Sequence, residues 1–105
     1  MPLSGPDEVF DALADATRRQ VLRHLAERGQ QTPTELADHL PVSRQAVSKH
    51  LDVLGRAGLV TSARTGRETR FTFQPDPLSD AAEWMADVGG TWDKRLANLR
   101  RRLGD

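Results

Sequence analysis

The spacing of apolar residues changes its period along the chain, and this change divides the sequence into elements. Up to about residue 57, apolar side chains recur every three or four positions, which is typical of amphipathic helices. We expect four helices there, over about residues 7–14, 16–28, 33–40 and 44–57. From Thr69 to Phe73 the alternation has period two, which predicts a strand. With "LVTSAR" before it and "TGRE" between, it forms a β-hairpin over residues 59–74.

Residues at the expected helix boundaries support this division. Asp15 and Ser43 are placed to cap the second and fourth helices. Thr32 precedes Glu35 by three residues, which is the spacing of a capping box at the start of the third helix. Pro41 then stops that helix. The third and fourth helices are therefore short and separated by a tight turn.

A linker over residues 74–77 leads to a long final helix over residues 78–103. Its apolar residues recur at heptad spacing, and the stripe is longer than a domain of this size needs for its own core. We therefore expect part of it to face another chain, although some positions will serve an intramolecular core. Gly89 and Gly90 cost about 1 kcal/mol each inside a helix and suggest a kink or a close helix crossing. Trp84 lies outside the stripe and is either a packing residue or part of an effector pocket. The heptad positions are Leu78, Ala82, Met85, Gly89, Trp92, Leu96, Leu99 and Leu103.

Charge is unevenly distributed in a chain whose formal net charge is zero. The formal charges of residues 1–40 sum to −3, those of residues 41–75 to +4 and those of residues 76–105 to −1. The sequence has 105 residues and no cysteine, which indicates a single domain without disulfides or thiolate chemistry. It contains no apolar run long enough to cross a membrane and no secretory signal, so we expect a cytoplasmic protein that does not bind membranes.

The basic middle segment coincides with the two short helices and the hairpin. A helix-turn-helix over residues 33–57 followed by a basic hairpin, or wing, over residues 59–74 can place one helix in a DNA major groove and the hairpin on the flanking backbone. The candidate DNA contacts lie on the polar face of the second helix and on the hairpin. They are Arg44, Gln45, Ser48 and Lys49, followed by Arg64, Arg67 and Arg70. Taken one at a time, these residues would equally suit a solvated surface, and only the set together favours nucleic acid.

The stretches "ALADATRRQVLRHLAE", "TELADHLPVSRQAVSKHLDVLGRAGLV" and "SARTGRETRFTF" resemble the ArsR family of winged helix-turn-helix repressors in order and spacing. The resemblance spans roughly residues 8–103. It implies a mainly α fold of order α-α-α-α-β-β-α and a homodimeric repressor that occludes a promoter at an inverted repeat. It places DNA contacts on Ser43, Arg44, Gln45, Ser48 and Lys49, with Arg67 at the wing tip. It also implies a dimer formed by the first and last helices, through Val9, Phe10, Leu13, Met85, Trp92, Leu96 and Leu99.

The sensing chemistry of many ArsR proteins has no counterpart in this sequence. Metal-sensing members carry cysteines on the third helix, or His and acidic ligands along the last helix, and this chain has neither. His50 lies beside the apolar stripe of its helix and is expected to pack there, and His39 next to Asp38 does not complete a metal shell. We therefore expect a regulator that does not sense metal and has no cofactor, and the sequence identifies no effector.

Two further classes of function remain open at this stage. A winged helix used only for protein interaction fits the zero net charge and predicts no salt-sensitive DNA binding. An enzyme is disfavoured because no cluster combines a nucleophile, a base and an orienting group. Arg18 and Arg19 could touch phosphate or pair with Asp15, and we favour the ion pair.

Overall fold

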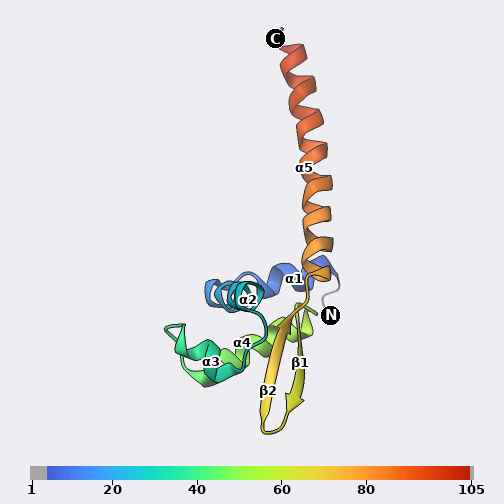
Figure 1. Ribbon diagram of the computed structural model, residues 1–105. Coiled ribbons are helices and arrows are strands. Elements are labelled where there is room, and N and C mark those ends of the chain that lie inside the picture. The colour runs from blue at the N-terminus through green and yellow to red at the C-terminus, as the bar shows by residue number, and fades with distance from the viewer. Residues whose placement is uncertain (1–4, 105) are drawn as a thin grey trace.

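The computed structural model describes residues 5–104 and has the predicted order of elements (Figure 1). Over these residues, five helices and one antiparallel hairpin make the fold mainly α, as the sequence indicated. The helices before the hairpin form a compact body, from which the last helix projects. The elements are α1 (Pro6–Ala12), α2 (Ala16–Arg28), α3 (Pro33–Asp38), α4 (Arg44–Arg56), β1 (Val60–Thr65), β2 (Glu68–Phe73) and α5 (Asp76–Arg102).

The three predicted helix caps are confirmed by hydrogen bonds. The Asp15 carboxylate accepts from the backbone N–H of Thr17 at 2.8 Å and of Arg18 at 3.1 Å. The Arg18 N–H is the main reason that the pKa of Asp15 lies below its ordinary value. Ser43 Oγ accepts from the N–H of Ala46 at 3.1 Å, and Thr32 forms a full capping box. These caps satisfy backbone donors that the first helical turn leaves free.

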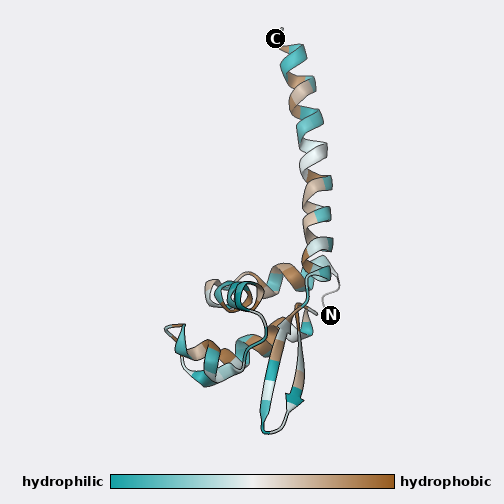
Figure 2. Ribbon diagram, viewed as in Figure 1, coloured by the Kyte–Doolittle hydropathy of each residue, from teal (hydrophilic) through white to brown (hydrophobic). Residues whose placement is uncertain are grey.

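The hydrophobic core lies where α1, α2, α3, α4 and the start of the hairpin meet. Every side chain that the helical spacing assigned to the buried face of α4 is buried, which fixes this helix against α2 and α3. Figure 2 shows apolar residues gathered on these facing surfaces. The largest fully buried side chains are Val9, Val21, Leu25, Leu36, Val47, Leu51, Leu54 and Leu59.

The hairpin is joined to the helices by an isolated β-bridge. Within the hairpin, Val60 pairs with Phe73 and Thr65 with Glu68, which leaves Gly66 and Arg67 as a two-residue turn. Gly66 has φ +63°, as the first central position of a type II′ turn requires. In addition, Gln31, just before α3, exchanges two backbone hydrogen bonds with Phe71 in β2, at 3.2 and 2.9 Å. The wing is therefore tied to the entry of the helix-turn-helix.

Some predicted helix boundaries were wrong by one or two residues. α1 ends at Ala12 and α3 at Asp38, earlier than the expected residues 14 and 40. α5 begins at Asp76, so part of the expected linker is helical. Its Pro77 stands in the first turn, where the missing N–H removes no intrahelical hydrogen bond.

The expected ion pair between Asp15 and the arginines of α2 was also wrong. Arg18 Nε donates to the carbonyl of Ala12 at 2.6 Å, and an Nη of Arg19 donates to the carbonyl of Leu13 at 2.7 Å. Both guanidinium groups thus satisfy carbonyls that the end of α1 leaves without helical partners. Asp15 is already occupied by backbone N–H groups at the start of α2.

α5 leaves the body after its first few turns and gives the molecule an elongated shape of 66 × 28 × 24 Å. Only Ala81 is buried along this helix. Figure 2 shows apolar residues recurring far beyond the body. Within residues 5–104, none of the helices has a stretch apolar enough to cross a bilayer.

Candidate nucleic-acid interface

The fourth helix, α4, presents a polar face directly opposite its buried one. Val47 and Leu51 point into the core, so Gln45 and Lys49, two positions before each of them, point roughly 200° away from them around the helix. Gln45 and Lys49 are both exposed. Their amide and ammonium groups are free to meet an external partner over the first two turns of α4.

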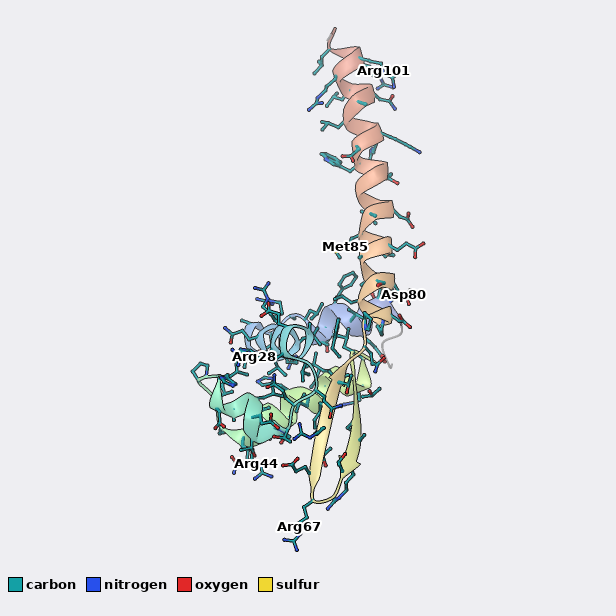
Figure 3. The ribbon with its side chains drawn as sticks, in the orientation of Figure 1. Arg28, Arg44, Arg67, Asp80, Met85 and Arg101 are labelled. Carbon is teal, nitrogen blue, oxygen red and sulfur yellow. The ribbon has the colours of Figure 1, made fainter. Side chains whose placement is uncertain are left out.

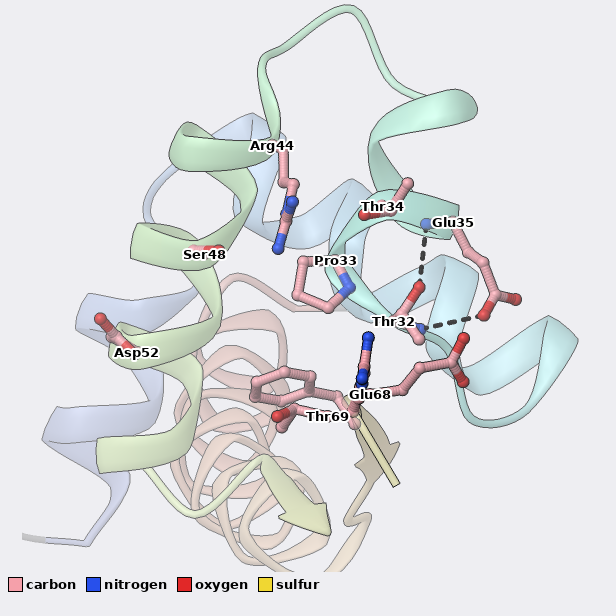
Figure 4. Close-up of a pocket in the computed structure, with 11 residues that line it drawn as sticks. Thr32, Pro33, Thr34, Glu35, Arg44, Ser48, Asp52, Glu68 and Thr69 are labelled. Atoms are coloured by element: carbon pink, nitrogen blue, oxygen red, sulfur yellow. Dashed lines mark hydrogen bonds between the residues drawn. The ribbon is translucent and has the colours of Figure 1, made fainter. Parts of the chain in front are cut away.

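Arg44 and Ser48 lie on the flank of α4 that faces the wing. Both line a groove between α3, α4 and the hairpin, together with Arg67 at the turn (Figure 4). Ser43 caps the helix and is exposed beside Arg44. The structure thus brings the five predicted residues of the recognition helix, Ser43, Arg44, Gln45, Ser48 and Lys49, to one end of α4.

The predicted hairpin arginines have three different environments. Arg67 sits in the two-residue turn and points away from the body at the tip of the wing (Figure 3). Arg64 is exposed on β1, and its Nε donates to the Gly66 carbonyl at 3.2 Å across the turn. Arg44 and Arg67 lie at the same end of the molecule, opposite Arg101 on α5 (Figure 3). Two of the predicted basic side chains are therefore available at the wing tip.

Arg70, the third of the predicted hairpin arginines, is held by two carboxylates and points toward the body. One of its Nη atoms lies 3.3 Å from Glu35 Oε1 and the other 3.0 Å from Glu68 Oε2. Glu35 Oε1 also accepts from the Thr32 N–H at 3.4 Å. One carboxylate therefore caps α3 and binds the wing. We call this cluster of Glu35, Glu68 and Arg70 the wing brace.

The groove between α3, α4 and the hairpin is lined by side chains of both charges. Its lining includes the carboxylates of Glu35, Asp52 and Glu68 and the guanidinium groups of Arg44 and Arg67. Phosphate oxygens would be repelled by the carboxylates and attracted by the guanidinium groups. Arg44 on α4 and Arg67 at the wing turn are therefore the groups of this lining that suit a polyanion.

Most of the predicted dimer residues lie on exposed or half-buried surface, with one exception. Val9 is only 2% exposed and belongs to the protomer's own core. Phe10 packs edge-on against Trp84 of α5, with ring centroids 5.5 Å apart, and Leu13 is half-buried. Trp84 thus has a packing contact, one of the two roles considered from the sequence. On α5, Met85 is 51%, Trp92 60% and Leu99 52% exposed, and Leu96 is partly buried.

Among the described residues, the histidines form no metal-binding constellation. The rings of His24 and His39 stack with centroids 5.8 Å apart, and a guanidinium Nη of Arg28 lies 3.0 Å from His39 Nε2. Across the part of the chain that the structure describes, no group of three or more His, Asp or Glu side chains could hold a metal ion. His50 is half-buried on α4, on the side that the apolar stripe indicated.

Sequence reasoning missed Glu35 and Gln31 as parts of this face. Glu35 was identified only as a capping residue, and Gln31 carried no recognisable signal. Both reach partners in β2 that lie 35 and 40 residues further along the chain. Such contacts depend on how the hairpin folds back onto α3, which local spacing does not encode.

Comparison with known proteins bears on what this surface binds. Residues 13–63 match the family model of a helix-turn-helix domain. The chain is 45% identical over 99 residues to the HTH-type transcriptional regulator Rv2034 of Mycobacterium tuberculosis, covering 94% of this chain and 89% of that protein.

The solved structures that resemble this chain are also those of transcriptional regulators. An ArsR-like transcriptional regulator from Rhodococcus sp. RHA1 superimposes with a TM-score of 0.81 at 41% identity, covering 92% of this chain and 91% of that one. A homodimeric winged helix-turn-helix DNA-binding domain from Mycobacterium bovis, Mb0332, described as a possible ArsR-family regulator, has a TM-score of 0.61 at 27% identity. That match covers 88% of this chain and 82% of Mb0332.

Proposed function

The chain belongs to the ArsR family of winged helix-turn-helix transcriptional regulators, and on that premise we propose that it is a homodimeric repressor that occludes a promoter at an inverted repeat. Members of this family are DNA-binding regulators rather than enzymes. Because its partner is genomic DNA, we place the protein in the cytoplasm. The observation that carries the proposal is the shared orientation of the start of α4 and the tip of the wing (Figure 3).

In the proposed complex, α4 reads bases and the wing holds the backbone. Gln45 can form a bidentate pair with an adenine edge, and Arg44 and Lys49 reach guanine or phosphate oxygens. Ser43 and Ser48 are short enough to let the start of α4 approach the groove closely. Arg64 and Arg67 contact flanking phosphates, which fixes register without reading sequence.

The homodimer is supported by the exposed apolar stripe of α5. Several large apolar side chains on this helix are half exposed or more, far from the protomer's own body. Contiguous apolar surface of this kind is typical of a subunit interface. Mb0332, which has the same fold, is homodimeric. Phe10, Leu13, Met85, Trp92, Leu96 and Leu99 are the proposed interface residues, and Val9 supports them from the core.

The experiment that tests this function selects DNA fragments of the source genome with the purified protein. We expect the bound fragments to share an inverted repeat whose half-sites are about one helical turn, or a multiple of one, apart. Binding should weaken steeply with salt, because each phosphate contact contributes about −0.9 to the slope of log K against log salt concentration. If no fragment binds in a salt-sensitive way, a protein-interaction module becomes the better description.

We assign the wing brace a positioning role in DNA binding. Its Glu35 and Arg70 side chains are 46% and 30% exposed, so the ion pair contributes modestly to stability. Glu35→Gln and Arg70→Gln should each lower operator affinity about two- to fivefold, and the double variant should lose little more. Glutamine still suits the capping box, so α3 keeps its cap. The expected salt slope of all three variants is that of the wild type.

A direct phosphate contact by Arg70 would give a different result. Arg70→Gln would then lower the salt slope, and Glu35→Gln, by freeing the guanidinium, would leave the affinity unchanged or raise it. Measuring binding by fluorescence anisotropy at several salt concentrations distinguishes the two roles. Arg67→Gln serves as the matched control, since it removes a guanidinium that no carboxylate of residues 5–104 holds, and it should reduce the slope.

A further inference from the structure

A pocket lies between α2 and the turn that joins α3 to α4, separate from the groove beside the wing. Side chains at every third or fourth position of α2 form one wall, because such residues are neighbours on a helix surface. The end of α3 and the turn form the other wall. The polar residues that line the pocket are Arg19, Gln20, Arg23 and His24 on α2 and His39 at the end of α3. We call it the turn pocket.

The formally charged side chains that line the turn pocket are all basic. Arg19 and Arg23 are exposed, lie four residues apart and pair with no carboxylate within residues 5–104. One Nη of Arg19 donates to a carbonyl at the end of α1, and its other donors stay free for a ligand. The same two guanidinium groups also border the apolar surface at the foot of α5. Asp15, Glu27 and Asp38 are near in sequence, but none of these carboxylates is part of the lining.

Two imidazole rings connect the walls of the turn pocket. His24 and His39 stack with centroids 5.8 Å and ring planes 14° apart. His24 Nδ1 is buried without a hydrogen-bond partner among the described residues, so the neutral ring carries its proton on Nε2. His39 Nε2 lies 3.0 Å from an Nη of Arg28, which can only donate, so the proton of this ring is on Nδ1. Each neutral ring therefore keeps one N–H donor that no group within residues 5–104 accepts.

This set of donors suits a phosphate group. A phosphomonoester carries a charge of about −1.5 to −2 at pH 7 and three strong acceptor oxygens, so it can engage two guanidinium groups and an imidazole N–H together. The planar fork of arginine binds phosphate oxygens in pairs. The Gln20 amide adds a further donor, and Leu40 and Pro41 provide an apolar surface for a short carbon skeleton. The lining thus fits a small phosphorylated molecule.

The turn pocket includes the segment that positions the recognition helix. Leu40 and Pro41 line the pocket, and Ser43, two residues later, caps α4. A ligand that contacts both α2 and this turn fixes the distance between them, and so acts on the start of α4 without occupying the DNA-binding surface. Arg28, which contacts His39, lies on the body away from the wing tip at Arg67 (Figure 3).

We propose that the turn pocket binds a small phosphorylated effector, which changes operator affinity through the turn before α4. The inference goes beyond the repressor function, because it assigns a second site and the chemical class of its ligand. Phosphate binding to this site does not require DNA, so it can be measured on the full-length protein alone.

Calorimetric titration with inorganic phosphate and with glycerol 3-phosphate, at constant ionic strength, tests the site. We expect saturable binding of glycerol 3-phosphate, and Arg23→Gln should weaken it about tenfold, because a charge-assisted contact is lost. Arg67→Gln is the matched control, since it makes the same change at the wing tip, and it should bind the ligand like the wild type. If inorganic phosphate binds equally well, the phosphate group alone is recognised. Thermal melting verifies that both variants are folded.

Fluorescence anisotropy with operator DNA tests the effector role. Saturating glycerol 3-phosphate should change the operator affinity of the wild type about fivefold or more and leave that of Arg23→Gln unchanged. Without ligand, Arg23→Gln should bind the operator like the wild type.

Several results would overturn the inference. Absence of saturable binding of both compounds, or equal binding by Arg23→Gln, would refute the site, and ligand binding without a change in operator affinity would refute the effector role. If Arg23→Gln lowers operator affinity and the salt slope in the absence of ligand, the pocket holds a DNA phosphate instead. In each case operator binding by the wild type, and with it the proposed repressor function, is judged separately.

Discussion

Replacing Leu99 by glutamate is expected to convert the dimer to a monomer and to lower operator affinity by a factor of about 100 or more. Leu99 is 52% exposed in the protomer, so the fold should tolerate the change. In the dimer, however, two carboxylates would be buried in an apolar interface, and each would lose its hydration without gaining a partner. A monomer also contacts only one half-site. A hundredfold loss corresponds to about 2.8 kcal/mol.

Sedimentation and fluorescence anisotropy on the same samples measure the two effects, and thermal melting confirms that the variant is folded. Leu96→Glu is expected to behave in the same way. Ala97→Glu, on the exposed side of α5, is the matched control and should remain a dimer with normal affinity. If Leu99→Glu stays dimeric, the stripe of α5 is not the subunit interface.

Gln45→Ala is expected to cost roughly 1 to 3 kcal/mol on the preferred operator and much less on unrelated DNA. The amide of Gln45 points away from the hydrophobic core and has no hydrogen bond within the described residues. Truncation to alanine should therefore leave the protein folded. The substitution removes only the proposed pairing with a base. Specificity should therefore fall by more than general affinity for DNA.

Arg67→Ala provides the contrast, because Arg67 stands at the wing tip rather than on α4 (Figure 3). It should weaken operator and random DNA to similar extents and lower the salt slope by about 0.9 for each phosphate that the wing no longer neutralises, or about 1.8 for the dimer. Competition binding at several salt concentrations separates the two variants. A uniform loss for Gln45→Ala on all sequences would contradict base reading. A change in base preference for Arg67→Ala would place the wing in a narrow minor groove.

The wing brace connects these predictions to the fold. It attaches β2 to the capping box of α3, so the wing's position relative to α4 is set by a cluster that also starts the helix-turn-helix. The proposed DNA contacts lie on α4 and the wing and the proposed dimer contacts on α1 and α5, so the two functions use different elements of one small domain.

The secondary-structure elements and the polar face of α4 could be predicted from the sequence, because both depend on interactions between residues close together in the chain. Caps at Asp15, Thr32 and Ser43 act within three residues, and the apolar period assigns Val47 and Leu51 to the core without knowledge of their partners. The polar residues on the opposite face of α4 follow from the same helical period, so the sequence pattern also identifies them. Boundary errors occurred where a single turn could end or extend a helix at small cost, as at Pro77.

Which arginines are paired with a carboxylate, and which apolar surface stays exposed, depends on the tertiary fold. Arg67 and Arg70 are indistinguishable in the sequence, yet the fold brings Arg70 to Glu35 and leaves Arg67 at the tip. Arg18 and Arg19 bind the end of α1 instead of Asp15 because those carbonyls lie within their reach. Val9 is in the core although Phe10 beside it packs on α5. Each outcome depends on distances between residues far apart in the chain or on helix packing, and a one-dimensional pattern contains neither.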